Sequence, residues 1–418
     1  MTPKIHVLPC GVTVIAEQVP IEAVNLSVWV NAGSALEADA INGMAHFLEH
    51  MIFKGSDRLK LGEFEALIES HGGNANAATS QDYTMFYVNV APQDYTKLAP
   101  LQLDLVLRAS LPNAEFQRER HVVLEEIRRS EDSPERRLYR YSSEQAYRQL
   151  PYRRPVLGPT DVIASVSVEQ MRDFHQQWYI PQNMTVVAVG NLPEAELVGA
   201  IADYFAMYSA APTPSHPQMG AEDPFTTIER QEINDPRIQQ ARMILSWRVP
   251  GFSQFAETYP LSILSSILGS GRTSRLVKDL REERHWVQQV SCSYYPHRWQ
   301  GTFQITAKVP TEHLASVEQV LREHLHRLQT ELIPVDELQK IRNQVASRFI
   351  FGSESPRERA SIYGYYHRIV GNLDSALTYV EQVHAIEPRA LRHAAQTYLN
   401  PDAYGLLTVR PAALGVAA

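Results

Sequence analysis

The sequence predicts an α+β protein built from two similar units, and three observations lead to this prediction. The chain has 418 residues, too many for one hydrophobic core, which suggests about two to four domains. Residues 210–223 are rich in proline and small residues and lie at the midpoint, as a linker does. The elements expected after this segment repeat the order of those before it. We therefore expect one domain at residues 1–209, a linker at 210–223 and a second domain at 224–418.

The first half predicts strands and helices in alternating groups. Residues 24–31 place apolar side chains at every second position, the period of a half-buried strand, and Gly72-Gly73 ends a helix. The same signals predict strands at 5–8, 12–18, 24–31, 76–80, 83–90 and 184–190. Helical spacing of apolar residues predicts helices at 43–51, 61–71, 95–110, 114–130, 135–149, 168–178 and 194–208.

The second half repeats this layout without the chemical motif of the first. Residues 259–268 occupy the place of the helix at 43–51 but contain no histidine. Strands are expected at 242–249, 287–295, 302–309 and 404–409. Helices are expected at 259–268, 274–283, 312–329, 334–351, 356–370 and 390–398.

The bulk composition is that of an ordinary globular protein, with 44% hydrophobic and 21% charged residues. The net charge of −8 argues against general binding to nucleic acid or to anionic membranes. No run approaches 18 apolar residues, so we expect no membrane-spanning segment. The N-terminus lacks a basic and apolar signal, so we expect a cytoplasmic protein, or a periplasmic one if a signal peptide has been removed. Cys10 and Cys292 are far apart, and we expect no disulfide between them.

The chemistry concentrates in residues 43–51, where His46, Glu49 and His50 form a His-x-x-Glu-His motif. Residues four apart lie on one face of an α-helix, so both imidazoles can reach one zinc ion. The neighbouring side chains are apolar: Met44, Ala45, Phe47, Leu48 and Met51. Two solvated histidines are the alternative, but burying three polar groups without compensation costs several kcal/mol, and a divalent cation compensates. This motif is the inverzincin signature.

A catalytic zinc ion keeps three protein ligands, so a third must come from elsewhere. The helix expected at 114–130 contains Glu119 and Glu126, which are seven residues apart and share a face. One of them can bind the metal while the other holds the second nitrogen of a histidine. A solvated, glutamate-rich surface helix is the alternative for this segment.

Residues 46–55 resemble the zinc-binding helix of the pitrilysin, or insulinase, family, particularly its mitochondrial-processing-peptidase-like branch. The resemblance implies that Glu126 is the third zinc ligand and that Glu119 supports a ligand without binding the metal. Residues 72–80 resemble the family's edge strand, which implies that Asn76 and Ala77 bind substrate; a turn without a ligand is the alternative. It also implies two similar domains, each a mainly antiparallel sheet covered by helices, of which only the first binds zinc.

This reading predicts a zinc endopeptidase with one Zn²⁺ per chain, which hydrolyses peptides or unfolded polypeptide segments. Zinc lowers the pKa of a bound water toward about 7, and Glu49 is the expected general base. The same ligands also accept manganese or cobalt. One alternative is a non-catalytic scaffold subunit, because the family also resembles subunits of the respiratory cytochrome complex. The other alternative is a zinc hydrolase that acts on small molecules.

The second half departs from the family at one informative position. The resemblance implies a substrate-binding arginine followed, seven residues later, by a tyrosine. Arg281 fits the first, but Gln288 stands at the second, and Tyr294 and Tyr295 are better explained as ordinary sheet residues. We therefore expect a homologous partner that supplies the arginine and tyrosine in a heterodimer, with a homodimer as the second choice. The second domain completes the substrate chamber in this view.

Overall fold

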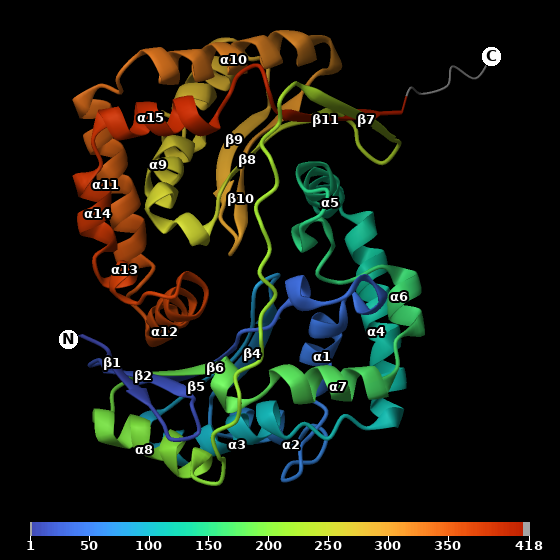
Figure 1. Ribbon diagram of the computed structural model, residues 1–418, viewed down its shortest axis with the longest axis vertical. Coiled ribbons are helices and arrows are strands. Elements are labelled where there is room, and N and C mark those ends of the chain that lie inside the picture. The colour runs from blue at the N-terminus through green and yellow to red at the C-terminus, as the bar shows by residue number, and fades with distance from the viewer. Residues whose placement is uncertain (1, 413–418) are drawn as a thin grey trace. The chain divides into compact units, whose positions relative to one another are not determined.

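The computed structural model describes residues 2–412, which form two compact units (Figure 1). The first unit contains the residues up to Ser130, together with Arg154–Gln218 and Ile350–Leu377. The second contains Glu131–Arg153, Met219–Phe349 and the residues from Thr378 onward. The units interleave along the chain, because each takes one segment from the opposite half of the sequence.

The sheet of the first unit has six strands in the order β1-β2-β6-β3-β5-β4. The β2–β6 pair is parallel and the other four pairs are antiparallel. Val28 lies opposite Phe86 of β5 and Val186 of β6, in the middle of the sheet. The strands are β1 (Lys4–Val7), β2 (Thr13–Gln18), β3 (Val24–Val30), β4 (Asn74–Thr79), β5 (Thr84–Val90) and β6 (Met184–Gly190).

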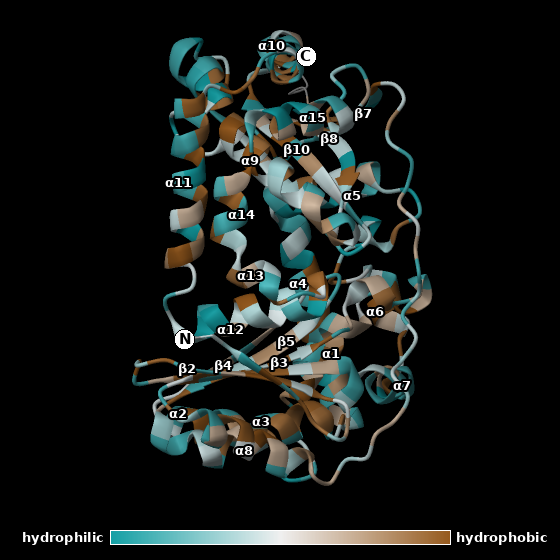
Figure 2. Cartoon of the chain, turned by 60° about the vertical axis from the view of Figure 1, so that its left-hand side comes forward, coloured by the Kyte–Doolittle hydropathy of each residue, from teal (hydrophilic) through white to brown (hydrophobic). Residues whose placement is uncertain are grey.

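Helices cover both faces of this sheet, and Figure 2 shows hydrophobic residues gathered on β3, β5 and α3. Leu26, Val28 and Phe86 belong to one continuous core with Phe47 and Leu48. The helices on this face are α1 (Met44–Ile52), α2 (Glu63–Ser70), α3 (Tyr95–Leu107), α7 (Val168–Trp178) and α8 (Glu194–Phe205). The long helix α4 (Asn113–Asp132) adds Phe116 and Val123 to this core.

The opposite face of the sheet is covered by α12 (Pro356–Tyr365), which comes from the second half of the sequence. Tyr363 packs in a cluster with Trp29 and Ile15 of the sheet. Gly364 fits because it lacks a side chain: a Cβ there would lie 2.1 Å from Nε1 of Trp29. Short helices α6 (Thr160–Ser165) and α13 (Asp374–Leu377) complete this unit.

The sheet of the second unit has the order β7-β11-β8-β10-β9, with β7–β11 as its parallel pair. Its strands are β7 (Glu229–Asp235), β8 (Ala241–Pro250), β9 (Gln289–Tyr295), β10 (Gln300–Val309) and β11 (Gly405–Pro411). One face packs against α9 (Thr258–Gly269), α10 (Leu314–Thr330), α11 (Val335–Phe351), α14 (Tyr379–Ala385) and α15 (Pro388–Tyr398). The other face packs against α5 (Pro134–Ala146), from the first half of the sequence.

The predicted α+β class is confirmed, since each unit is a mainly antiparallel sheet covered by helices. Several elements differ from expectation. Helices α6, α13 and α14 were not predicted, and the helix expected at 356–370 ends in a π-helical segment, η9 (Tyr366–Val370). Strand β7 was not predicted, because its exposed, charged residues lack the apolar alternation that marks a strand. The helix expected at 274–283 contains a π-helical segment, η7 (Val277–Glu283).

Cys10 and Cys292 are buried and free, as expected. Among the described residues, no helix has both the length and the apolar character needed to cross a bilayer.

Candidate metal centre

Helix α1 begins at a fixed point because a buried carboxylate caps it. Glu37 accepts hydrogen bonds from the backbone N–H groups of Gly43 and Ala45, both at 2.7 Å, and from Nδ2 of Asn42 at 2.8 Å. Burial raises the pKa of Glu37 to about 7, against these hydrogen bonds. Gly43 has a φ of 97°, and a Cβ there would lie 2.6 Å from the carbonyl oxygen of Leu157. Sequence reasoning missed Glu37, whose place in an acidic loop gave no signal of a cap.

The structure brings His46, His50 and Glu126 together, from α1 and α4. Their ligand atoms all lie within 4.8 Å of one another. Nε2 of His46 and Nε2 of His50 are each 3.6 Å from Oε2 of Glu126. These separations exceed a hydrogen bond, yet they are close to the roughly 3.4 Å between two ligands of a tetrahedral zinc with bonds of about 2.1 Å. The donor set and its spacing therefore fit a zinc ion.

The two imidazoles differ in their surroundings. Burial lowers the pKa of His46 to about 4, and His50 adds to the effect, so His46 is neutral near pH 7, the form that binds a metal. Burial alone would lower the pKa of His50, but the carboxylates of Glu126 and Glu119 outweigh it and raise this pKa. Nδ1 of His46 is buried and has no hydrogen-bond partner among the described residues.

Glu119 lies behind His50, on the face of α4 that also carries Glu126. Its Oε1 accepts a hydrogen bond from Nδ1 of His50 at 2.9 Å, and its Oε2 lies 2.7 Å from Nζ of Lys54. Burial would raise the pKa of Glu119, but Lys54 and His50 outweigh it and lower this pKa. The sequence reasoning singled out Glu119 and missed Lys54, although the four-residue spacing of His46, His50 and Lys54 was a usable signal.

Glu49 is oriented by the edge strand of the sheet. Its Oε2 accepts a hydrogen bond of 2.5 Å from the hydroxyl of Thr79, the last residue of β4. Burial raises the pKa of Glu49 despite this hydrogen bond. Glu49 is not one of the three residues whose ligand atoms converge. Thr79 was missed as a site residue, although it lies in the segment that carries Asn76 and Ala77.

Asn76 and Ala77 lie in the middle of β4, which pairs only with β5 among the described strands. The side chain of Asn76 is turned back to its own backbone, where Oδ1 accepts a hydrogen bond from the N–H of Ala77 at 2.9 Å. Residues of β4 are partly or fully exposed. This free strand edge offers backbone groups to an added strand.

Arg281 lies in the second unit, on η7, where Nε and Nη2 contact Oε1 of Glu282 at 2.9 and 2.6 Å. The backbone N–H of Gln288 donates to the carbonyl of Lys308. Tyr294 donates its hydroxyl to the carbonyl of Pro250 at 2.6 Å, so that phenol already has a structural partner. Tyr295 is 42% exposed.

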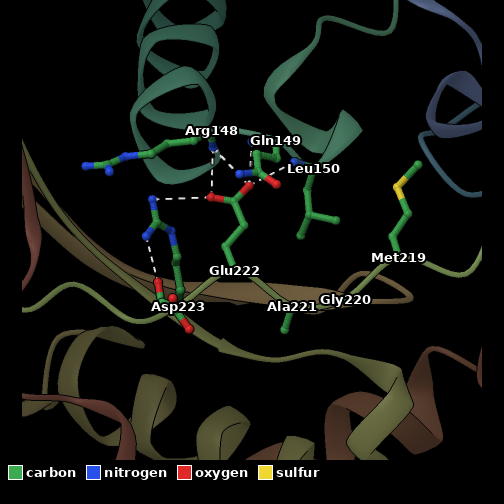
Figure 3. Close-up of a pocket in the computed structure, with 9 residues that line it drawn as sticks. Arg148, Gln149, Leu150, Met219, Gly220, Ala221, Glu222 and Asp223 are labelled. Atoms are coloured by element: carbon green, nitrogen blue, oxygen red, sulfur yellow. Dashed lines mark hydrogen bonds and ion pairs between the residues drawn. The ribbon is translucent and has the colours of Figure 1, made fainter.

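A separate polar cavity of about 520 Å³ lies in the second unit, around Glu222 (Figure 3). The Glu222 carboxylate accepts hydrogen bonds of 2.8–2.9 Å from the successive backbone N–H groups of Arg148, Gln149 and Leu150. Nη2 of Arg248 lies 3.4 Å from its Oε2. These contacts attach the end of the linker to residues 148–150, which follow α5. Their role is therefore structural.

Two protein-family models match this chain, and so do curated relatives over nearly its whole length. The family described as "Insulinase (Peptidase family M16)" matches residues 12–160, and "Peptidase M16 inactive domain" matches residues 165–345. A protein named as a zinc protease in Bacillus subtilis is 25% identical over 409 residues, covering 96% of each chain. A probable mitochondrial-processing peptidase subunit beta of Arabidopsis thaliana is 24% identical, covering 98% of this chain and 78% of that protein.

Solved structures show the same fold. A protease from Helicobacter pylori superposes with a TM-score of 0.92 at 24% identity, covering 98% of this chain and 99% of that one. A peptidase M16 inactive domain from Pseudomonas fluorescens gives a TM-score of 0.89 at 17% identity, covering 98% of each chain.

Proposed function

Because the chain belongs to the insulinase family of M16 peptidases, we propose that it is a zinc-dependent endopeptidase acting on peptides or unfolded polypeptide segments. The observation that carries the proposal is the convergence of His46, His50 and Glu126, with their ligand atoms within 4.8 Å. These three residues would hold one zinc ion per chain. When bound, zinc supplies an activated water molecule and polarises the scissile carbonyl.

Glu49 is the proposed general base. Its carboxylate accepts the proton of the attacking water and later donates that proton to the leaving amine. Thr79 orients this carboxylate through its hydroxyl, which donates to Oε2, and through its backbone N–H. Because burial raises the pKa of Glu49, the carboxylate is a stronger base than an exposed glutamate.

The substrate would bind as an added strand along β4, near Asn76 and Ala77. The free edge of β4 supplies backbone hydrogen bonds, which require an extended partner and do not depend on its side chains. An extended, unfolded segment meets this requirement and a folded surface does not. The same strand ends at Thr79, whose hydroxyl donates to Glu49, so the proposed substrate edge and the general base lie close together in space although they are 30 residues apart in the sequence.

We also propose that a homologous partner completes the site. The arginine that the family resemblance implies is present as Arg281, which contacts Glu282. Gln288 replaces the implied tyrosine, and the hydroxyl of Tyr294 is already bonded to Pro250. A heterodimer in which the partner supplies the phenol is favoured over a homodimer that uses Arg281 alone. A relative of this chain is itself named as a subunit of a processing peptidase.

The experiment is cleavage of an unstructured peptide by the purified chain, alone and with its co-purifying partner. We expect chelator-sensitive cleavage that needs the partner for full rate and is lost in Glu49→Gln. Full activity of the chain alone would contradict the heterodimer. A scaffold subunit would bind its partner equally well with Glu49→Gln and would cleave nothing, and a small-molecule hydrolase would leave the peptide intact.

A further inference from the structure

We propose that Lys54 is a positioning residue of the metal centre, which acts on the zinc ligand His50 through Glu119. The inference rests on the proposed zinc site. It assigns to Lys54 the task of holding the Glu119 carboxylate in the one orientation that fixes the His50 ring.

The geometry places three side chains in a row. Nζ of Lys54 lies 2.7 Å from Oε2 of Glu119, and Oε1 of the same carboxylate accepts the hydrogen bond from Nδ1 of His50. Both oxygens of Glu119 are therefore in contact with the segment 50–54, Oε1 with His50 and Oε2 with Lys54. The carboxylate cannot rotate without breaking one of these charge-assisted contacts.

The position of Lys54 follows from the local fold. Helix α1 ends at Ile52, and the backbone N–H of Lys54 still bonds to the carbonyl of Met51 at 3.0 Å. The chain thus keeps a turn beyond the helix, and Lys54 follows His50 by the same four residues that separate His50 from His46. One carboxylate of α4 can in this way contact both His50 and Lys54.

The contact is shielded from solvent. The side chains of Lys54 and Glu119 are 23% and 12% exposed, unlike the surface pair Lys4–Glu194, in which the lysine is 67% exposed. A buried carboxylate without a cation is costly, so loss of Lys54 favours rearrangement of Glu119. His50 would then lose the acceptor that keeps the proton on Nδ1 and leaves Nε2 free to bind the metal.

The direction in which zinc affinity changes on loss of Lys54 distinguishes a positioning role from a direct electrostatic effect of its charge. Lys54 is a cation close to a site for another cation, so its charge alone opposes metal binding, and removing the charge should tighten it. A positioning role predicts the opposite, because the weakened contact between Glu119 and His50 costs affinity. Losing such a supporting contact typically costs about 10–100-fold in metal affinity.

The test is zinc affinity of the full chain, measured by competition with a chromophoric chelator. We expect Lys54→Met to weaken zinc binding about 10–100-fold. Lys54→Arg, which keeps the charge and the N–H donors, should restore most of the affinity. Lys60→Met, an exposed lysine six residues away, is the matched control and should leave affinity unchanged.

A double-mutant comparison shows whether Lys54 acts through Glu119. Glu119→Gln should itself weaken zinc binding, and Lys54→Met should add little in that background. Unchanged or tighter binding in Lys54→Met, or fully additive losses, would overturn the proposal. Lys54→Gln gives the same comparison if Lys54→Met does not fold. A wild-type chain that binds no zinc would instead refute the proposed function itself.

Discussion

The hydroxyl of Thr79 donates a hydrogen bond of 2.5 Å to the carboxylate of Glu49, and thereby joins the edge strand to the zinc helix. Thr79 closes β4, the strand along which substrate is proposed to lie. Strand addition at β4 and orientation of the general base thus depend on the same short segment. This contact gives the first prediction.

Thr79→Val should lower kcat about 10–100-fold and leave KM nearly unchanged, because a hydrogen bond to a charged group is worth about 1.5–3 kcal/mol. Valine keeps the β-branched shape that suits the strand but removes the donor. Thr79→Ser keeps the hydroxyl and should retain most of the activity. Steady-state peptide cleavage at saturating zinc checks this. Equal losses in both variants would mean that the strand, and not the hydroxyl, matters.

Variants of Glu49 should lose turnover but keep zinc, whereas variants of the three converging residues should lose the zinc itself. Glu49→Gln should retain zinc and lower turnover by about 10²–10⁴-fold, since only the proton acceptor is removed. His46→Ala and Glu126→Ala should lose the metal itself. Zinc content by metal analysis, measured alongside cleavage, distinguishes the two classes. Loss of zinc in Glu49→Gln would show that the carboxylate is a ligand and not the base.

Glu37 should make stability depend on pH in the direction opposite to that of an ordinary acid. Its pKa is raised from 4.5 to about 7, so the folded state binds more protons than the unfolded state in this interval. Stability from this group is present below about pH 4.5 and declines as the pH rises through 7. Relative to Glu37→Gln, the wild type should therefore lose up to about 3 kcal/mol between pH 5 and pH 8.

Thermal or urea unfolding of both proteins at the two pH values measures this difference. Glu69→Gln, at an exposed position of α2, is the control and should differ from the wild type by a constant amount. A Glu37→Gln difference that does not change with pH, or that favours the wild type more at pH 8, would contradict the buried, easily protonated carboxyl.

Glu222 should stabilise the second unit without touching the metal centre. Burial would raise its pKa, but the backbone N–H groups of residues 148–150 and Arg248 outweigh it and lower the pKa. The contribution is therefore present above the ordinary value of 4.5 and is lost as the pH falls through the lowered folded-state pKa. At pH 7, Glu222→Gln should cost about 1–3 kcal/mol.

The measurement is unfolding by urea, with the exposed Glu312→Gln as the control. Zinc affinity of Glu222→Gln should equal that of the wild type, because Glu222 and the metal centre belong to different units. A loss of zinc affinity would show that the cluster around Glu222 does more than hold the linker.

Much of the fold follows from local patterns. The alternation in residues 24–31 and the helical spacing in 43–51 predicted β3 and α1 within about two residues, because side-chain period depends only on neighbours in the chain. Strand β7 could not be predicted in this way, because its largely charged and polar residues show no alternation of apolar side chains. The π-helical segment η7 could not be predicted either, because its spacing is close to that of an α-helix.

The exchange of segments between the units could not be read from the sequence. Helix α5 is amphipathic, but nothing in its own residues indicates that its apolar side packs against Ile244 and Leu407, which lie more than 100 and more than 260 residues later in the chain. Helix α12 likewise meets Trp29 of the first sheet. Burial of apolar area is not directional, so a pattern says that a face is buried but not what covers it.

The sequence by itself determined the elements and the residue types that can hold zinc, because period and ligand spacing within one helix are local properties. Only the tertiary structure decided how Glu126 reaches His46 and His50, how Thr79 and Lys54 meet Glu49 and Glu119, and which carboxylate caps α1. Those contacts join residues 6 to 80 positions apart. Their geometry is set by how helices and strands pack on the sheet, which no short stretch of sequence contains.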